Sequence, residues 1–293
     1  MFSRNRKAKN DFEKHQLPSN RKESIKDILS LRWTVLVKVG FILLLFGVPL
    51  MIHQILINIS VYEIELAFQN GNIDELYARQ AIFDTINTGN LIFIPLLVLF
   101  GIGLSGGLRI LRQLIWQEPI FFWHDLKQGI KSHALYVSLS IILIGIANFF
   151  FNYIIRGASF YEDANLISFL IGAVMVLLVI SFYFGFFVIT QTTLYQLSFY
   201  SMYKNAFLLT MRYFFQAMIY LLMLILPWLI LFVDLGSFYV FVFCILFVIS
   251  PFQLLVIMSY AYGLYDDLIN KNHHQDIYRK GLFTPDADLK EHS

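Results

Sequence analysis

Long apolar blocks, separated by shorter polar segments, run through most of the chain. A transmembrane helix needs about 20 apolar residues to cross a hydrocarbon core roughly 30 Å thick. Six blocks reach that length, at 35–57, 88–109, 134–155, 166–193, 207–232 and 238–262. Runs such as 174–180 do not alternate apolar and polar residues, as the strands of a membrane barrel do. The pattern therefore predicts an all-α fold, a polytopic membrane helical bundle with six transmembrane helices.

The composition also indicates lipid as the solvent. Apolar residues make up 58% of the chain and charged residues 14%, whereas soluble domains average about 45–50% and about 25%. The lipid bilayer is thus the first partner that we expect, and the net charge of +2 gives no case for nucleic acid. The single cysteine, Cys244, lies in the sixth predicted span, which excludes an intrachain disulfide and a cysteine metal cluster.

Lysine and arginine are distributed unevenly over the predicted connections. Twenty of the 22 fall in alternate segments on one side of the bundle, and two, Arg79 and Arg156, fall on the other side. In membrane proteins the cytosolic loops carry the excess of lysine and arginine. We therefore expect a multi-pass membrane protein with both termini in the cytosol.

Polar segments flank the predicted membrane domain, 33–263. Segment 1–32 is basic and has few apolar residues before Ile25, so it is predicted to be mostly disordered. Residues 264–293 are predicted to be a polar cytosolic tail, and the acidic pair at 266–267 is interpreted as solvated. The first external loop, 58–87, is acidic and is expected to present a small acidic helix outside.

Two cytosolic connections have the pattern of amphipathic helices. Apolar residues recur at near-helical spacing among polar ones in 116–131, and 195–212 has a similar character. This periodicity is typical of helices that lie in the membrane interface. We predict two cytosolic interfacial helices, named elbows here, each leading into the next span. The candidate docking residues on the elbows are Trp116, Phe122, Trp123, Lys127, Lys131 and Lys204.

Both elbows carry a pattern that points to a family. In 107–145 the pattern consists of Arg109, Arg112, Phe121, Phe122, Asp125, Lys127, Gly129, Ile130 and Lys131, and in 200–226 of Lys204, Asn205 and Ala206. These stretches resemble the YesL-like family of bacterial integral membrane proteins. The resemblance implies a plasma-membrane protein of unknown activity, in a family whose named member is associated with carbohydrate-utilisation genes. The basic N-terminal segment, the long first external loop and the polar tail depart from the family pattern.

Other motifs have structural explanations. The glycines of 101–106 spell G-x-G-x-x-G, but they lie inside an apolar helix, whereas dinucleotide binding requires a preceding strand. We interpret them, with Gly107, as residues that let helix backbones approach closely. The histidines, among them His124 and His133, lack the spacing of a zinc site and are interpreted as solvated.

Polar residues within the predicted spans are few. Asn148, Gln216 and Gln253 are candidates for a polar path, although such side chains more often form hydrogen bonds between helices. No acid or base lies at mid-membrane, where ion-coupled transporters usually place one. No motif for a catalytic site, a cofactor or a metal occurs, so the chain is not predicted to be an enzyme.

Two functions follow as hypotheses. The first is an accessory or scaffold protein in transport or envelope homeostasis, with a transporter or another membrane protein as its partner and a link to carbohydrate uptake. The alternative is a small permease or channel whose path passes near Asn148, Gln216 and Gln253.

Overall fold

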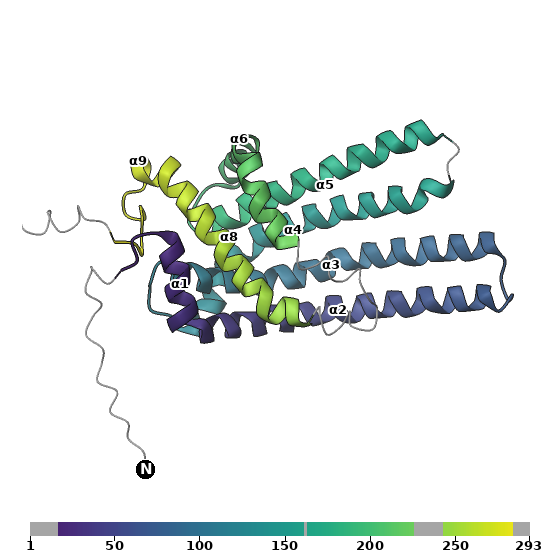
Figure 1. Ribbon diagram of the computed structural model, residues 1–293, viewed down its shortest axis with the longest axis horizontal. Helices are drawn as coiled ribbons and strands as arrows, with labels where there is room; N and C mark the ends of the chain where they lie inside the picture. The colour runs from purple at the N-terminus through teal and green to yellow at the C-terminus, as the bar shows by residue number, and fades with distance from the viewer. Residues whose placement is uncertain (1–16, 161–162, 226–242, 284–293) are drawn as a thin grey trace, which may run out of the picture.

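The structure describes residues 17–160, 163–225 and 243–283 (Figure 1). The regular elements of these residues are helices. The computed structural model confirms the all-α prediction for these residues. The α-helices are α1 (Arg21–Leu31), α2 (Trp33–Gln69), α3 (Glu75–Ile115), α4 (Phe122–Gly157), α5 (Ala164–Thr192), α6 (Phe199–Ile225), α8 (Ser250–Tyr265) and α9 (Lys271–His273). Shorter elements are the 3₁₀-helix η2 (Ala158–Phe160) and the π-helices η4 (Ile245–Ile249) and η5 (Asp266–Asn270).

Five described helices are long and apolar enough to cross a membrane. They are α2, α3, α4, α5 and the continuous run Ile245–His273, which joins η4, α8, η5 and α9. Of the predicted fifth span, 207–232, the structure describes the residues up to Ile225, which belong to α6. The rest of that span and the start of the sixth lie outside the described residues.

Four long helices lie side by side, and α8 crosses them (Figure 1). Helices α2, α3, α4 and α5 pack in chain order, and α8 contacts α2, α3, α5 and α6. At one end of the bundle, α1 and the C-terminal segment 266–283 meet the connections 116–121 and 193–198 (Figure 1). We name this the capped end. The opposite, far end carries the turn 70–74 between α2 and α3.

The first predicted external loop is a helical hairpin. Helix α2 has 37 residues and α3 has 41, which correspond to lengths of about 55 and about 60 Å. Both exceed the roughly 30 Å core of a bilayer. The acidic segment 58–87 therefore consists mostly of the two helix ends, joined by a turn in which Gly71 has a φ of 72°. Asp74 caps α3 by accepting the N–H of Tyr77 at 2.7 Å.

The glycines of α3 pack against both neighbouring helices, as predicted. Gly103 faces the ring of Phe46 on α2, and a Cβ there would collide with it. On the other side, a Cβ added to Gly129 of α4 would lie 2.9 Å from Cα of Gly106 and 2.8 Å from Cβ of Arg109. The backbones of α3 and α4 are thus in direct contact at this point, which holds the start of α4 against α3.

The two elbows differ from each other in structure. The first is not a separate helix, because α4 runs without interruption from Phe122 through the predicted third span to Gly157. Its first turn is held by Asp125, whose Oδ2 accepts the backbone N–H of Phe121 at 2.7 Å. In the second elbow, α6 contains a kink at Tyr213, with φ −115° and ψ 21°. The helical segment before the kink covers residues 199–212 of the predicted elbow, 195–212.

The N-terminal segment contains an ordered helix. Residues 21–31 form α1, and Ile28 on this helix is fully buried. The side chain of Asn20 caps the helix by accepting the N–H of Glu23 at 3.0 Å. Within segment 1–32, which is predicted to be mostly disordered, residues 21–31 thus form a helix whose apolar side packs on the bundle. Residues 1–16 lie outside the described residues.

Candidate functional site

Asp266 joins α1 to the C-terminal segment 266–283 at the capped end. Its carboxylate accepts hydrogen bonds from Nη2 of Arg21 at 2.8 Å, Nδ2 of Asn270 at 2.9 Å and the backbone N–H of Arg279 at 3.1 Å. The Arg21 and Asp266 side chains are only 12% and 6% exposed. The interpretation of Asp266 as a solvated tail charge is therefore wrong, because three donors, one of them the cationic Arg21, compensate its burial. The neighbouring Asp267 is exposed.

The C-terminal segment then covers the connection between α3 and α4. Nζ of Lys280 lies 2.6 Å from Oε1 of Glu118 and 4.3 Å from the centre of the Trp116 ring. Gly281, with a φ of 80°, lies so close to the backbone of Trp116 that a Cβ would come within 2.7 Å of it. Trp116 is only 8% exposed beneath this cover.

Hydroxyl groups connect α5 to the run that contains α8. Two threonine–tyrosine pairs are buried there, Thr190 with Tyr265 at 2.6 Å and Thr193 with Tyr262 at 2.7 Å. Tyr195, in the connection after α5, donates its hydroxyl to Oδ1 of Asn270 at 2.6 Å. Burial, and to a smaller extent the negative charge of Asp266, raises the pKa of Tyr195. The phenol therefore remains a hydrogen-bond donor at physiological pH.

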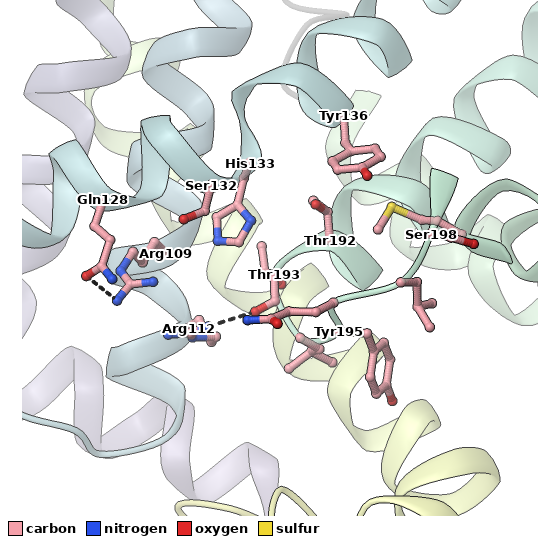
Figure 2. Close-up of a pocket in the computed structure, with 14 residues that line it drawn as sticks. Arg109, Arg112, Gln128, Ser132, His133, Tyr136, Thr192, Thr193, Tyr195 and Ser198 are labelled. Atoms are coloured by element: carbon pink, nitrogen blue, oxygen red, sulfur yellow. Dashed lines mark hydrogen bonds between the residues drawn. The ribbon is translucent and has the colours of Figure 1, made fainter. Parts of the chain in front are cut away.

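A pocket of about 510 Å³ lies between the last turns of α3, the first half of α4, the end of α5 and the connection to α6 (Figure 2). The lining includes the charged and polar Arg109, Arg112 and His133 together with Tyr136 and Met202. None of the residues that line it is acidic. We name it the arginine pocket.

Arg109 is partly compensated by neighbouring groups. Its Nη2 donates to Oε1 of Gln128 at 2.6 Å, and its Nε lies 3.7 Å from Oδ1 of Asp125. The Asp125 side chain is 5% exposed. Its carboxylate interacts both with Arg109 and with the backbone N–H of Phe121 at the start of α4. Both interactions fix the guanidinium group at the edge of the pocket.

Arg112 has a different set of partners. Its Nη1 donates to the backbone oxygen of Thr193 at 2.9 Å, and its guanidinium carbon lies 4.8 Å from the centre of the Trp116 ring. Among the described residues, no carboxylate lies within ion-pair distance of it. Arg112 therefore contributes a positive charge to the pocket that no side chain on the described chain neutralises directly.

His133 is buried between the arginines and the hydroxyl-bearing wall of the pocket (Figure 2). The residue is 8% exposed, and its Nε2 has no hydrogen-bond partner in the described part of the chain. It lies close enough to Arg112 and Arg109 to interact with their charges. The interpretation of His133 as solvated is wrong, because its position four residues after Gly129 places it on the buried face of α4. His124, by contrast, is exposed.

The three residues of the predicted polar path lie outside the arginine pocket. Asn148 is half-buried on α4, where its side-chain and backbone oxygens accept from Nδ2 of Asn152. Gln216 is exposed on α6. Gln253 is buried on α8, with 8% of its surface exposed. A shared path along the three side chains stays a prediction.

The candidate docking residues divide into a buried and an exposed group. Trp116 lies under the C-terminal segment and is not on the surface. Phe122 is half-buried, with Nζ of Lys38 5.7 Å from its ring centre. Trp123 is 68% exposed. The three candidate lysines, Lys127, Lys131 and Lys204, are also exposed.

Sequence reasoning did not find the arginine pocket as a site. Arg109 and Arg112 belong to the excess of basic residues that indicates the membrane orientation. Their spacing of three residues also puts both on one helix face. The spacing of Asp125, Gly129 and His133, four residues apart, was a usable signal for one buried stripe. The contribution of connection 193–198 depends on tertiary packing and had no local signal.

The long apolar helices define a polytopic membrane protein that contacts the lipid bilayer. Comparisons of the chain with protein-family models, curated proteins and solved structures find no match.

Proposed function

We propose that this protein is a non-enzymatic accessory or scaffold protein of the bacterial plasma membrane, with its capped end in the cytosol. In this role it binds a transporter or another membrane protein and supports transport or envelope homeostasis. The observation that carries the proposal is the exposed aromatic and basic face at the start of α4. There, Phe121 is 71% and Trp123 68% exposed, followed by the exposed Lys127 and Lys131.

A fixed backbone beneath this face supports a docking role. The first turn of α4 is held by Asp125, and Gly129 places the next turn in contact with α3. A preorganised surface loses less conformational entropy when a partner binds. Aromatic residues are also enriched among the residues that dominate binding energies.

The orientation and the kind of partner rest on sequence features. The excess of lysine and arginine on the connections of the capped end supports a cytosolic location. The resemblance of the two elbows to YesL-like proteins supports a bacterial plasma-membrane setting and a link to carbohydrate uptake.

Co-purification from native membranes in a mild detergent tests the proposal. We expect a defined membrane protein to elute with the wild type, and its recovery to fall about tenfold or more in Trp123→Ala and Lys127→Glu. Loss of about 1.4 kcal/mol of binding free energy is sufficient for that change. Trp33→Ala and Lys22→Glu are matched controls, since both residues are exposed on other helices of the same end. A wild type that elutes alone, or controls that lose the partner equally, would contradict a docking role for this face.

A second candidate, a small permease or channel, is favoured by the surroundings of Gln253. This buried side chain follows the π-helix η4 and Pro251, and π-helical segments frequently occur at functional sites. The test is uptake of labelled monosaccharides into proteoliposomes. We expect Gln253→Leu, Asn148→Leu or Gln216→Leu to reduce uptake if these residues line the path. Uptake that all three variants leave unchanged would exclude the path, and no uptake by the wild type would exclude monosaccharide transport.

A further inference from the structure

We propose that the arginine pocket binds a phosphate-bearing ligand, held by Arg109, Arg112 and His133. This site is separate from the exposed face of α4 and does not depend on partner docking. Figure 2 shows the three side chains on neighbouring parts of the pocket wall, with the arginines on α3 and the histidine on α4.

The charge of the pocket selects an anion. Two guanidinium groups line it, and no acidic residue does. The acidic groups that act on Arg109 are Asp125 and Glu118, and Glu118 itself pairs with Lys280 at 2.6 Å. Arg112 has no carboxylate partner among the described residues. An anion in the pocket therefore meets a positive charge that no carboxylate of the described residues neutralises directly.

The available donors favour a phosphate group over a carboxylate. Guanidinium groups bind carboxylate and phosphate with similar geometry. A phosphate monoester, however, offers more acceptor oxygens than the two of a carboxylate, and the pocket offers more than two donors. In addition to the arginines, it contains the buried Nε2 of His133, which lacks a partner within the described chain. The hydroxyl-bearing Ser132 also lines it.

The size of the pocket indicates that the ligand has an organic part. A volume of about 510 Å³ falls within the range of roughly 300–1,000 Å³ that is typical of small-molecule sites. Tyr136, Leu197 and Met202 supply apolar and aromatic surface beside the charged groups. A sugar phosphate or glycerol phosphate fits this combination of charge and volume.

The phosphate group has two possible sources, a soluble ester or the headgroup of an anionic lipid. The pocket wall leads to the exposed aromatic residues of the second elbow: Tyr136 contacts Phe199, with ring centres 6.2 Å apart, and Phe199 is 53% exposed. A lipid headgroup at the interface and a solute from the aqueous side both present the same chemistry to the arginines.

Two binding measurements on the full-length protein distinguish these sources. The first is calorimetric titration in neutral detergent with glycerol 3-phosphate, with glycerol as the uncharged control and inorganic phosphate as competitor. The second is native mass spectrometry after release from nanodiscs of phosphatidylglycerol or phosphatidylcholine. Saturable binding of glycerol 3-phosphate supports a soluble ligand, and selective retention of phosphatidylglycerol supports a lipid ligand.

Variants connect either result to the pocket. We expect Arg112→Gln and His133→Leu to weaken binding about tenfold or more, since each removes a charged or buried donor. His133→Leu leaves the contacts of Arg112 with Thr193 and Trp116 in place. This variant therefore remains informative if Arg112→Gln folds poorly. Arg212→Gln is the matched control, because Arg212 is exposed on α6. Absence of binding in both measurements, or equal weakening in the control and in both pocket variants, would overturn the proposal.

Discussion

Buried charged side chains determine the arrangement of the capped end at the level of single residues. Arg21 serves two acceptors at once, Asp266 through Nη2 and the backbone oxygen of Lys280 through Nη1, at 2.8 and 3.0 Å. In return, Arg279 of the C-terminal segment donates to the backbone oxygen of Ser19, just before α1, at 2.9 Å. The two terminal segments thus hold each other through charge-assisted hydrogen bonds, which are stronger than neutral ones.

Replacing the central carboxylate tests this arrangement. Asp266→Asn leaves Arg21 buried without its counter-charge, and we expect a loss of about 3 kcal/mol in the free energy of unfolding. The measurement is the melting temperature of the purified protein in detergent. Asp267→Asn is the matched control, because Asp267 is the exposed neighbour, and its melting temperature should stay near that of the wild type. Equal melting temperatures for both variants would show that the Arg21–Asp266 pair contributes little.

At the level of elements, the contact between α3 and α4 depends on glycine. A methyl group at Gly129 would lie 2.8 Å from Cβ of Arg109 and 3.0 Å from the backbone oxygen of Ser105. These neighbours belong mainly to helix backbone, which cannot move aside as the end of a flexible side chain can. The same contact sets the distance between Arg109 on α3 and His133 on α4, and therefore the width of the arginine pocket.

Alanine substitutions compare the stability of the protein when a methyl group is added at the packed Gly129 and at the open position Gly172. We expect Gly129→Ala to destabilise the protein by about 1–3 kcal/mol through overpacking. Gly172→Ala on α5 should have no such cost, because a Cβ there meets nothing within 4 Å and alanine is the better helix former. Thermal unfolding of the two variants in the same detergent measures the difference. If both have the stability of the wild type, α3 and α4 are not in tight contact at Gly129.

The sequence was sufficient for features that depend on local pattern. Apolar blocks long enough to span lipid predicted the presence of the four long helices α2, α3, α4 and α5, and the small-residue pattern around Gly103 and Gly107 predicted helix packing. It did not predict the extent of α2 and α3, because polar residues such as those of 58–69 form helix as readily as apolar ones once a helix has started. The burial of Asp266 and His133 was missed for another reason. Their partners lie far away in sequence, so no local pattern contains the contact.

At the scale of the whole molecule, the two ends of the bundle have different characters. The capped end brings together α1, the C-terminal segment 266–283, two connections and the arginine pocket, and the backbone N–H of Phe283 donates to the backbone oxygen of Pro18 at 3.0 Å. The far end carries the acidic hairpin of α2 and α3. Between the ends, the sides of the long helices expose large apolar residues, among them Phe41, Leu45 and Phe169, as expected for surfaces in contact with lipid.

We propose that this bundle crosses the plasma membrane with its capped end in the cytosol. Site-directed thiol labelling of intact cells with a membrane-impermeant maleimide tests it most directly. In a Cys244→Ser background, Asn72→Cys reports on the turn at the far end and Lys22→Cys on α1 at the capped end; both positions are exposed. We expect labelling of Asn72→Cys in intact cells and of Lys22→Cys only after the membrane is permeabilised. Labelling of Lys22→Cys in intact cells, with Asn72→Cys protected, would contradict it.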